Sequence, residues 1–407
     1  MPVNLTTPVA TELLPVKGVL LGTAEANIKK PNRKDLLLIQ LTPQATVAGV
    51  FTQNRFCAAP VIVAQEHMAA GQGILALVIN TGNANAGTGE LGLAAARATC
   101  AEVATILDCE AQQVLPFSTG VIMEALPLAK LLSGLPGCVA NLREDNWFDA
   151  AHAIMTTDIV AKAISRQITF DDIPITITGI AKGSGMIHPD MATMLCFIMT
   201  DANIASPLLK KCLLLSVETS FNSITVDGDT STNDMILCMA NGAAGNKRIA
   251  AGTKELKKFQ ACLDAVAKSL ARQVVRDGEG ATKFVEIVVR GAKNQAEAKR
   301  AAVTVAKSSL VKTALFGEDA NWGRIMAALG YSGVDMDESR TDITIGKAKL
   351  VEKGLGQGKA VDREAALALK QREVRITIDL HKGKAESTIL TCDLSNEYIN
   401  INANYRS

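Results

Sequence analysis

The chain has 407 residues, enough for two or three compact lobes, and its 42 basic and 41 acidic side chains nearly cancel. Because a general nucleic-acid binder carries an excess of positive charge, we expect no nucleic-acid partner. Hydrophobic residues make up 48% of the chain but aromatic residues only 4%, which predicts a large, mainly aliphatic core.

The amino-terminal segment lacks the basic stretch and apolar stretch of a secretory signal. No apolar run approaches the ~20 residues of a membrane-spanning helix. The nine cysteines form no CxxC pair and no Cys/His spacing typical of zinc, and most have apolar neighbours. We therefore expect reduced thiols, no metal and no membrane partner, in a protein of the cytoplasm.

Predicted strands and helices are interspersed along the chain. Short apolar or alternating runs predict strands, and longer amphipathic or Ala-rich runs predict helices. This order predicts an α/β or α+β fold built from layers, with substantial sheets. In chain order we expect strands at residues 36–40 and 74–80, a helix at 91–107, strands at 175–180 and 193–200, helices at 207–221 and 253–275, strands at 284–290, 302–307 and 374–380, a turn at 381–384, and strands at 387–394 and 398–401.

The segment KGSGMIHPDMAT, residues 182–193, holds the threonine with the most informative surroundings. Its glycines and proline predict a bent loop that leads to Thr193 at the start of a buried strand. In such a loop the Thr193 hydroxyl can attack the carbonyl of Ala192 and cut the chain. The small Ala192 side chain leaves room for a tetrahedral intermediate.

A cut there would give Thr193 both a nucleophile and a base. A threonine hydroxyl is a poor nucleophile near neutral pH and needs a neighbouring base. An α-amino group has a pKa of ~7.7–8.0 and would be tethered beside the hydroxyl. For that reason His188, also in the loop, is not assigned as the base. Taken alone, a threonine behind a Gly/Pro turn more often only begins a core strand, so the residue types favour that simpler interpretation.

Several longer motifs occur in a fixed order along the chain. They are GVFTQNRFCAAPV (49–61), INTGNANAGTG (79–89), STGVI (118–122), MTTD (155–158), KGSGMIHPDMATML (182–195), DGDTSTND (227–234), DGEGATK (277–283), ANWGRI (320–325) and INANYRS (401–407). Together they resemble the glutamate N-acetyltransferase family, also called ornithine acetyltransferase, of arginine biosynthesis. The resemblance extends over essentially the whole chain.

The resemblance implies a layered αββα sandwich, of the kind also seen in self-cleaving aminopeptidases. It implies self-cleavage between Ala192 and Thr193 into an alpha piece, residues 1–192, and a beta piece, residues 193–407. The pieces of 192 and 215 residues would stay together, both would contribute to one active site, and two copies of each would form a heterotetramer.

The implied reaction moves an acetyl group from N2-acetyl-L-ornithine to L-glutamate through an acetyl-threonine intermediate, in a ping-pong scheme without a cofactor. Some family members also take the acetyl group from acetyl-coenzyme A. The resemblance assigns Thr193 as nucleophile, Thr119 and Gly120 as the oxyanion hole, and Thr156, Lys182, Thr193, Glu279, Asn402 and Ser407 as substrate-binding residues. Lys182 is a plausible carboxylate anchor, and Glu279 could hold an ammonium group or help proton transfer.

The chain departs from the family pattern at three places. Met123 stands where a glycine is common, the segment after MTTD lacks a proline, and Ser407 replaces the usual threonine. Serine keeps the hydroxyl, whereas Met123 could reshape the loop behind the oxyanion hole.

Three other motifs resemble known sites only in part. DGEGATK lacks the spacing of a P-loop, so no nucleotide site is expected. DGDTSTND has Thr232 and Cys238 where a calcium-binding loop needs glycine and glutamate, so we interpret it as a structural turn that lines the site. Trp322 and Arg324 could recognise a carboxylate or form a subunit interface.

Two alternatives to acetyl transfer are kept open. A self-activating amidohydrolase or aminopeptidase would use water as the acceptor. An uncleaved amino-acid-binding protein would need no reactive threonine at all.

Overall fold

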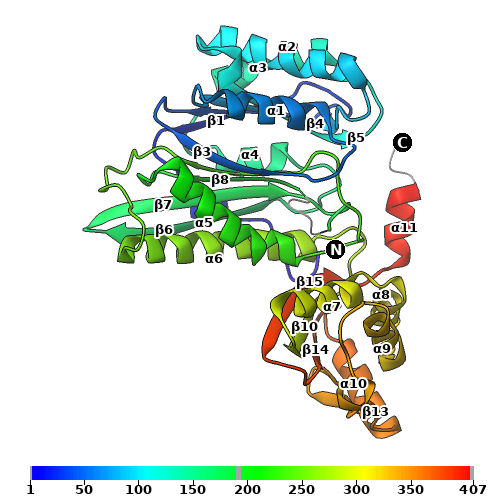
Figure 1. The fold of residues 1–407 in the computed structure, drawn as a ribbon. Coiled ribbons are helices and arrows are strands. Elements are labelled where there is room, and N and C mark those ends of the chain that lie inside the picture. Colours follow the sequence, from blue (N-terminus) through cyan, green and yellow to red (C-terminus); the bar gives the residue numbers. More distant parts are fainter. Residues whose placement is uncertain (1, 189–193, 404–407) are drawn as a thin grey trace.

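The computed structural model describes residues 2–188 and 194–403, which form three sheets and the helices around them (Figure 1). The strands are β1 Val19–Ala24, β2 Leu36–Leu41, β3 Thr46–Phe51, β4 Ala76–Asn83, β5 Val114–Val121, β6 Lys162–Phe170, β7 Ile173–Lys182, β8 Leu195–Thr200, β9 Met235–Ala240, β10 Phe284–Ala292, β11 Asp342–Ile345, β12 Ala348–Glu352, β13 Leu355–Gly356, β14 Glu373–Asp379 and β15 Ala385–Cys392. The helices are α1 Ala59–Ala70, α2 Gly89–Leu107, α3 Leu128–Ala140, α4 Trp147–Ala153, α5 Ser206–Glu218, α6 Lys254–Arg276, α7 Gln295–Lys307, α8 Ser309–Phe316, α9 Trp322–Gly330, α10 Lys359–Leu369 and α11 Asn396–Ala403.

Two sheets stacked face to face form the centre of the molecule. The first has the strand order β1-β2-β4-β5 and the second β3-β9-β8-β7-β6. Helices α2 and α3 cover the outer face of the first sheet, and α5 and α6 cover the outer face of the second (Figure 1). This is the αββα arrangement that the family resemblance implies.

The interface between the two sheets is apolar. Leu37, Ile79 and Phe117 of the first sheet meet Phe197 and others from the second in one buried cluster. The rings of Phe117 and Phe197 pack edge to face with centroids 5.0 Å apart. Such burial supplies most of the stabilisation of a layered fold, and it fixes the ends of β5 and β8 relative to each other.

The second sheet mixes strands from both sides of the predicted cut. β3 pairs antiparallel with β9, β9 pairs parallel with β8, and β8 pairs antiparallel with β7. Lys182, the last residue of β7, is the register partner of Leu195, the first residue of β8. The chain therefore leaves β7 and enters β8 at the same end of these two paired strands.

The third sheet, in the order β13-β12-β11-β14-β10-β15, packs against α7 to α10 around a separate apolar cluster. Residues 381–384 do connect two strands, β14 and β15, but those strands are not paired with each other. β10 lies between them, parallel to β14 and antiparallel to β15. After β15, helix α11 extends away from this sheet toward the edge of the two stacked sheets (Figure 1).

Two predicted strands were wrong. Residues 302–307 belong to helix α7, in which Ala298, Ala302, Val305 and others are buried on one face, and the Asn294 side chain caps the first turn. The β-branched Val and Thr residues favoured a strand, but the 3.6-residue spacing of the buried positions determines the outcome. Residues 398–401 belong to helix α11, where none of the residues is fully buried, so the apolar alternation in this segment reflects no sheet face.

The other predicted elements are confirmed to within a few residues, except that residues 189–193 lie outside the described part of the chain. All nine cysteines are free thiols, and seven of them are buried. In the described ranges, no helix is long and apolar enough to cross a bilayer.

Candidate active site

The parallel strands β4 and β5 end in a glycine pair at the edge of the first sheet. Gly82 is the register partner of Gly120, and both have positive φ angles, 99° and 138°. A Cβ atom on Gly120 would lie only 2.2 Å from the carbonyl carbon of Gly82. Only glycine fits such a close approach, so this edge requires the glycine that the family motif supplies. Thr119 precedes it and is almost fully buried.

A polar network fixes the backbone around Thr119. The Ser118 hydroxyl donates to the Asn80 side chain at 2.6 Å. The Asn233 amide donates to the carbonyls of Ser118 at 2.9 Å and Ala84 at 2.6 Å. Three motifs that lie far apart in the sequence therefore meet here. Sequence reasoning did not select Asn80 and Asn233, although both lie inside the motifs that carried the resemblance.

Lys182 reaches the Thr119 hydroxyl from the other sheet. Its Nζ donates a hydrogen bond of 3.1 Å to Thr119 Oγ1. Burial lowers the pKa of Lys182, and the negative charge of Asp158 opposes that shift. Because Thr119 Oγ1 accepts from the lysine, the hydroxyl proton of Thr119 can be donated elsewhere.

Asp234 ends the DGDTSTND motif beside this lysine. Its side chain is 3% exposed, and burial raises its pKa well above the usual range. Its Oδ2 atom accepts no hydrogen bond from the residues that the structure describes. Burial away from water disfavours the charged form of a carboxyl, so it favours the neutral form of Asp234.

A buried ion-pair cluster joins the loop after α4 to the loop after β7. Asp158 accepts from Lys162 Nζ at 2.6 Å, from the Gly183 amide at 2.8 Å and from the Thr156 amide at 3.0 Å. Lys162 Nζ also donates to Asp277 at 2.6 Å. Asp158 therefore holds Thr156 and the first residue of the predicted cleavage loop in one place.

The two carboxylates of this cluster have opposite pKa shifts. Burial raises the pKa of Asp277, and Lys162 opposes this. Burial also acts to raise the pKa of Asp158, but the charges of Lys162 and Lys182 outweigh it and hold that pKa well below its usual range. Asp158 is thus the member most firmly held as an anion.

The DGDTSTND motif forms the turn that supports the cleavage loop. Asp227 accepts from the backbone amides of Met186 at 2.7 Å and Ile187 at 2.9 Å. Met186 has a positive φ angle of 52°, which is uncommon for a residue with a side chain. Ile187 in turn accepts a hydrogen bond of 2.8 Å from the Val226 amide. The expected structural turn is confirmed, and its function in this structure is to fix the loop before residue 189.

Glu279, in the segment between α6 and β10, packs against the cleavage loop and is 6% exposed. Its amide donates to the carbonyl of Ser184 at 2.8 Å, and a Cβ atom on Gly185 would lie 2.3 Å from its carboxylate. The Asn402 amide on helix α11 donates to Glu279 Oε2 at 2.8 Å. Gly185 is therefore required for Glu279 to pack here, and α11 is what brings Asn402 to it.

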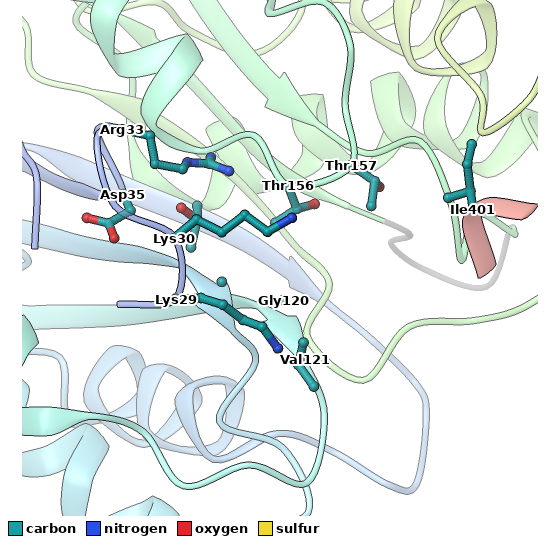
Figure 2. Close-up of a pocket in the computed structure, with 11 residues that line it drawn as sticks. Lys29, Lys30, Arg33, Asp35, Gly120, Val121, Thr156, Thr157 and Ile401 are labelled. Carbon is teal, nitrogen blue, oxygen red and sulfur yellow. The ribbon is translucent and has the colours of Figure 1, made fainter. Parts of the chain in front are cut away.

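A cavity of about 230 Å³ opens beside Gly120 (Figure 2). Both Thr156 and Thr157 line it, and the Thr157 hydroxyl is hydrogen-bonded to Ser184 at 2.7 Å. Its remaining lining residues include a basic segment before β2 that sequence reasoning missed, because no motif marks it. The lining residues are Lys29, Lys30, Arg33, Asp35, Thr81, Gly82, Gly120, Val121, Thr156, Thr157 and Ile401.

The structure brings most of the predicted site residues together. Thr119, Gly120 and Lys182 lie at one point, Thr156 lines the adjoining cavity, and the pair Glu279 and Asn402 packs on the loop that follows Lys182. Ala192, Thr193 and Ser407 lie outside the described residues. Among the described residues, no group of three or more acidic, histidine or cysteine side chains could hold a metal ion.

His188, which was not assigned as the base, and the two undecided residues Trp322 and Arg324 are absent from the cavity lining. His188 Nδ1 is 3.3 Å from the Thr225 hydroxyl. Trp322 and Arg324 belong to α9 in the third-sheet unit, where Arg324 donates to the carbonyl of Leu310 at 2.9 Å. Neither is among the residues that line the cavity beside Gly120.

Comparison with known proteins gives a family. A model of the ArgJ family matches residues 20–407. The arginine biosynthesis bifunctional protein ArgJ of Colwellia psychrerythraea is 47% identical over the full length of both chains. The crystal structure of the bifunctional protein ArgJ from Bacillus halodurans is 42% identical with a TM-score of 0.50, and covers 51% of this chain and 98% of that one. Ornithine acetyltransferase from Mycobacterium tuberculosis, solved with ornithine, is 35% identical with a TM-score of 0.38, and covers 44% of this chain and 94% of that one. This chain belongs to the ArgJ family.

Proposed function

We propose that this protein cuts itself before Thr193 and then transfers the acetyl group of N2-acetyl-L-ornithine to L-glutamate. The observation that carries the proposal is the hydrogen bond from Lys182 to Thr119, next to Gly120 and at the point where β7 ends and β8 begins. The segment with the expected cut leaves and re-enters the sheet beside these residues.

Self-cleavage in this proposal uses the loop that Asp158 and Asp227 hold. The hydroxyl of Thr193 attacks the carbonyl carbon of Ala192, the peptide C–N bond breaks, and the nitrogen takes up the proton. This leaves a free amine on Thr193 and an ester between Ala192 and the Thr193 hydroxyl. Water then hydrolyses the ester to the Ala192 carboxylate and restores the hydroxyl. The anchored amides of Gly183, Met186 and Ile187 support this step because they fix the upstream side of the loop.

Acetyl transfer then takes place in two half-reactions at the same hydroxyl. Thr193 Oγ attacks the acetyl carbonyl of acetylornithine, its proton passes through the Thr193 amine to the leaving nitrogen, and ornithine departs. The amine of glutamate attacks the resulting ester and restores the hydroxyl. In both steps the carbonyl oxygen becomes an oxyanion, for which the Thr119 hydroxyl and the Gly120 N–H are the proposed donors.

The other predicted residues receive roles in binding. Lys182 would attract the substrate α-carboxylate, and Thr156 and Asn402 would contact its polar backbone atoms. Glu279, which Asn402 contacts, would attract the ornithine ammonium group or move a proton. Ser407 would complete the site from the last residue of the chain.

Two comparisons support this proposal. The relatives are named for arginine biosynthesis and for ornithine acetyltransferase, and one was solved with ornithine. The solved Bacillus halodurans chain covers about half of this one while being matched almost completely. A piece of about that length is what a cut between residues 192 and 193 would produce. A heterotetramer with two copies of each piece is the proposed assembly.

The decisive experiment is amino-terminal sequencing of the purified protein together with an assay of acetyl transfer. We expect two polypeptides, the second beginning Thr-Met-Leu-Cys, and formation of N-acetylglutamate with little free acetate. Thr193→Ala should give one uncut chain without transfer, and Thr193→Ser should retain part of both reactions.

Other results would contradict the proposal in different ways. A fully active uncut chain would exclude Thr193 as an amino-terminal nucleophile. Release of acetate in the presence of excess glutamate would show a hydrolase instead. The same assay with acetyl-coenzyme A in place of acetylornithine determines whether the protein also has a second acetyl donor.

A further inference from the structure

The cavity beside Gly120 has a strongly basic wall that no role described above uses. The wall is formed by the segment before β2, here called the basic strap, residues 29–33, which contributes Lys29, Lys30 and Arg33. The acidic lining residue is Asp35, which is 1% exposed. Its two oxygens accept from the amides of Ala26 at 2.6 Å and Ile28 at 2.7 Å, so its charge is used to hold the loop.

The strap is built as a rigid support for Lys30. Asp35 fixes the backbone just before the strap, and Arg33 fixes its end by donating to the carbonyl of Met155 at 2.5 Å. Lys29 forms an ion pair of 3.5 Å with Glu124. Lys30, in contrast, makes no ion pair with the described residues and extends across the cavity toward Thr156 (Figure 2).

The opposite end of the cavity has no basic side chain among its lining residues. Ile401 of α11 lines that end, away from Arg33 and Asp35 (Figure 2). The next residue, Asn402, donates to the Glu279 carboxylate. The Glu279 carboxylate therefore lies behind this end and does not line the cavity, so the charged side chains that line it lie on the side of the strap.

We propose that Lys30, supported by Arg33 and Lys29, binds the side-chain carboxylate of the acetyl acceptor, and so selects an amino acid with an acidic side chain. This rests on the proposed function, in which one site must accept glutamate after releasing ornithine. A carboxylate gains charge-assisted hydrogen bonds at the strap, whereas the side-chain ammonium of ornithine is repelled there. At about 230 Å³ the cavity suits an amino acid and is smaller than the ~300–1,000 Å³ of pockets for larger ligands.

The test is the substitution Lys30→Met, which keeps an unbranched side chain one atom shorter and removes its charge. We expect the KM for glutamate to rise about 10- to 100-fold, since hydrogen bonds to charged groups contribute ~1.5–3 kcal/mol and ~1.4 kcal/mol is tenfold. The KM for acetylornithine and the single-turnover burst of ornithine release should stay within about twofold of wild type. The KM for glutamine, the neutral analogue, should change little, so the preference for glutamate over glutamine should fall.

A matched control lies in the same stretch of chain. Lys34 pairs with Asp149 at 2.5 Å and does not line the cavity, so Lys34→Met should leave both KM values unchanged. An unchanged preference for glutamate over glutamine in Lys30→Met would overturn the proposal. So would a raised KM for acetyl-coenzyme A with an unchanged KM for glutamate, because the strap would then bind phosphate groups.

Calorimetric measurement of glutamate and glutamine binding distinguishes a failure of this proposal from a failure of the proposed function. Weaker binding of glutamate to Lys30→Met, with binding of glutamine unchanged, supports the strap even in a preparation that transfers no acetyl group. Equal binding of glutamate to both proteins overturns the strap even where wild type is fully active.

Discussion

The ammonium group of Lys182 donates a 3.1 Å hydrogen bond to the hydroxyl of Thr119, and this bond joins the ends of two strands in different sheets. β5 belongs to the first sheet and β7 to the second, and the apolar layer between them sets their separation. The site therefore depends on the packing of the two sheets as well as on the side chains themselves.

Thr119→Ala removes the hydroxyl that we propose as an oxyanion donor and leaves the Lys182 ammonium without this acceptor. We expect kcat for acetyl transfer to fall about 100- to 1,000-fold, the usual loss for one oxyanion-hole donor. Steady-state kinetics of ornithine release measures it. Thr119→Ser should restore most of the rate, and equal losses in both variants would show that the methyl group, not the hydroxyl, matters.

Gly120→Ala places a methyl group against the backbone of Gly82, where no side chain could move aside. We expect a lower melting temperature and loss of transfer activity, because the two strand ends must separate. Thermal denaturation followed by circular dichroism measures the first effect. The control is Gly71→Ala, which has a positive φ of 70° but open space around the added atom, and so shows backbone strain of ~1–2 kcal/mol without the clash. Equal shifts in both would contradict the close approach.

Asp227→Asn replaces an acceptor of two loop amides by a group that can present N–H to them. We expect slower self-cleavage, seen as uncut chain on a denaturing gel during a time course after synthesis. Asp229→Asn is the control, because Asp229 is exposed and accepts neither amide. A cleavage rate equal to wild type in Asp227→Asn would show that the loop needs no clamp from this turn.

Lys162→Met leaves Asp158 and Asp277 buried without their shared cation. Removing one partner of a buried ion pair typically costs ~3–5 kcal/mol. The surface variant Lys349→Met, which breaks exposed pairs with Asp342 and Glu352, should change stability little. Melting temperatures of both variants against wild type measure the difference.

The effect of Lys162→Met should also depend on pH. In wild type the pKa of Asp158 is depressed, so its stabilisation is present above the unfolded pKa of ~3.9 and is lost as the pH falls through the lower folded value. In the variant, burial without Lys162 raises the pKa of both carboxyls, so protonation at low pH relieves the destabilisation. The loss of melting temperature should therefore be larger at pH 7 than at pH 4, and the reverse order would contradict these roles.

The sequence predicted the layers of the fold better than their connections. Amphipathic spacing and strand alternation placed α6 and β7 correctly, because each is decided by its own residues. That β10 lies between β14 and β15 could not be seen, because strand order depends on contacts between distant segments. Helix α11 was mistaken for a strand because its residues pack on no core that would impose a helical pattern.

The candidate site could be predicted where a motif existed and not elsewhere. Thr119, Gly120 and Lys182 lie in motifs, and the structure places them together. The buried Lys162 and the strap residue Lys30 have no distinctive neighbours in the sequence, and a lysine is by default expected at the surface. Only the fold shows what surrounds each of them: Asp158 and Asp277 contact Lys162, and Lys30 lines the cavity.

The mixed strand order of the second sheet determines whether folding or cleavage comes first. β3 and β7 come from before residue 192, and β8 and β9, which lie between them, come from after it. Neither piece contains all the strands of this second sheet, so the second sheet must form while the chain is still continuous. After a cut between residues 192 and 193, unfolding would release two polypeptides, and their reassembly would require a collision between them. The uncut chain should then refold at any dilution, while the mature protein should become harder to recover as it is diluted.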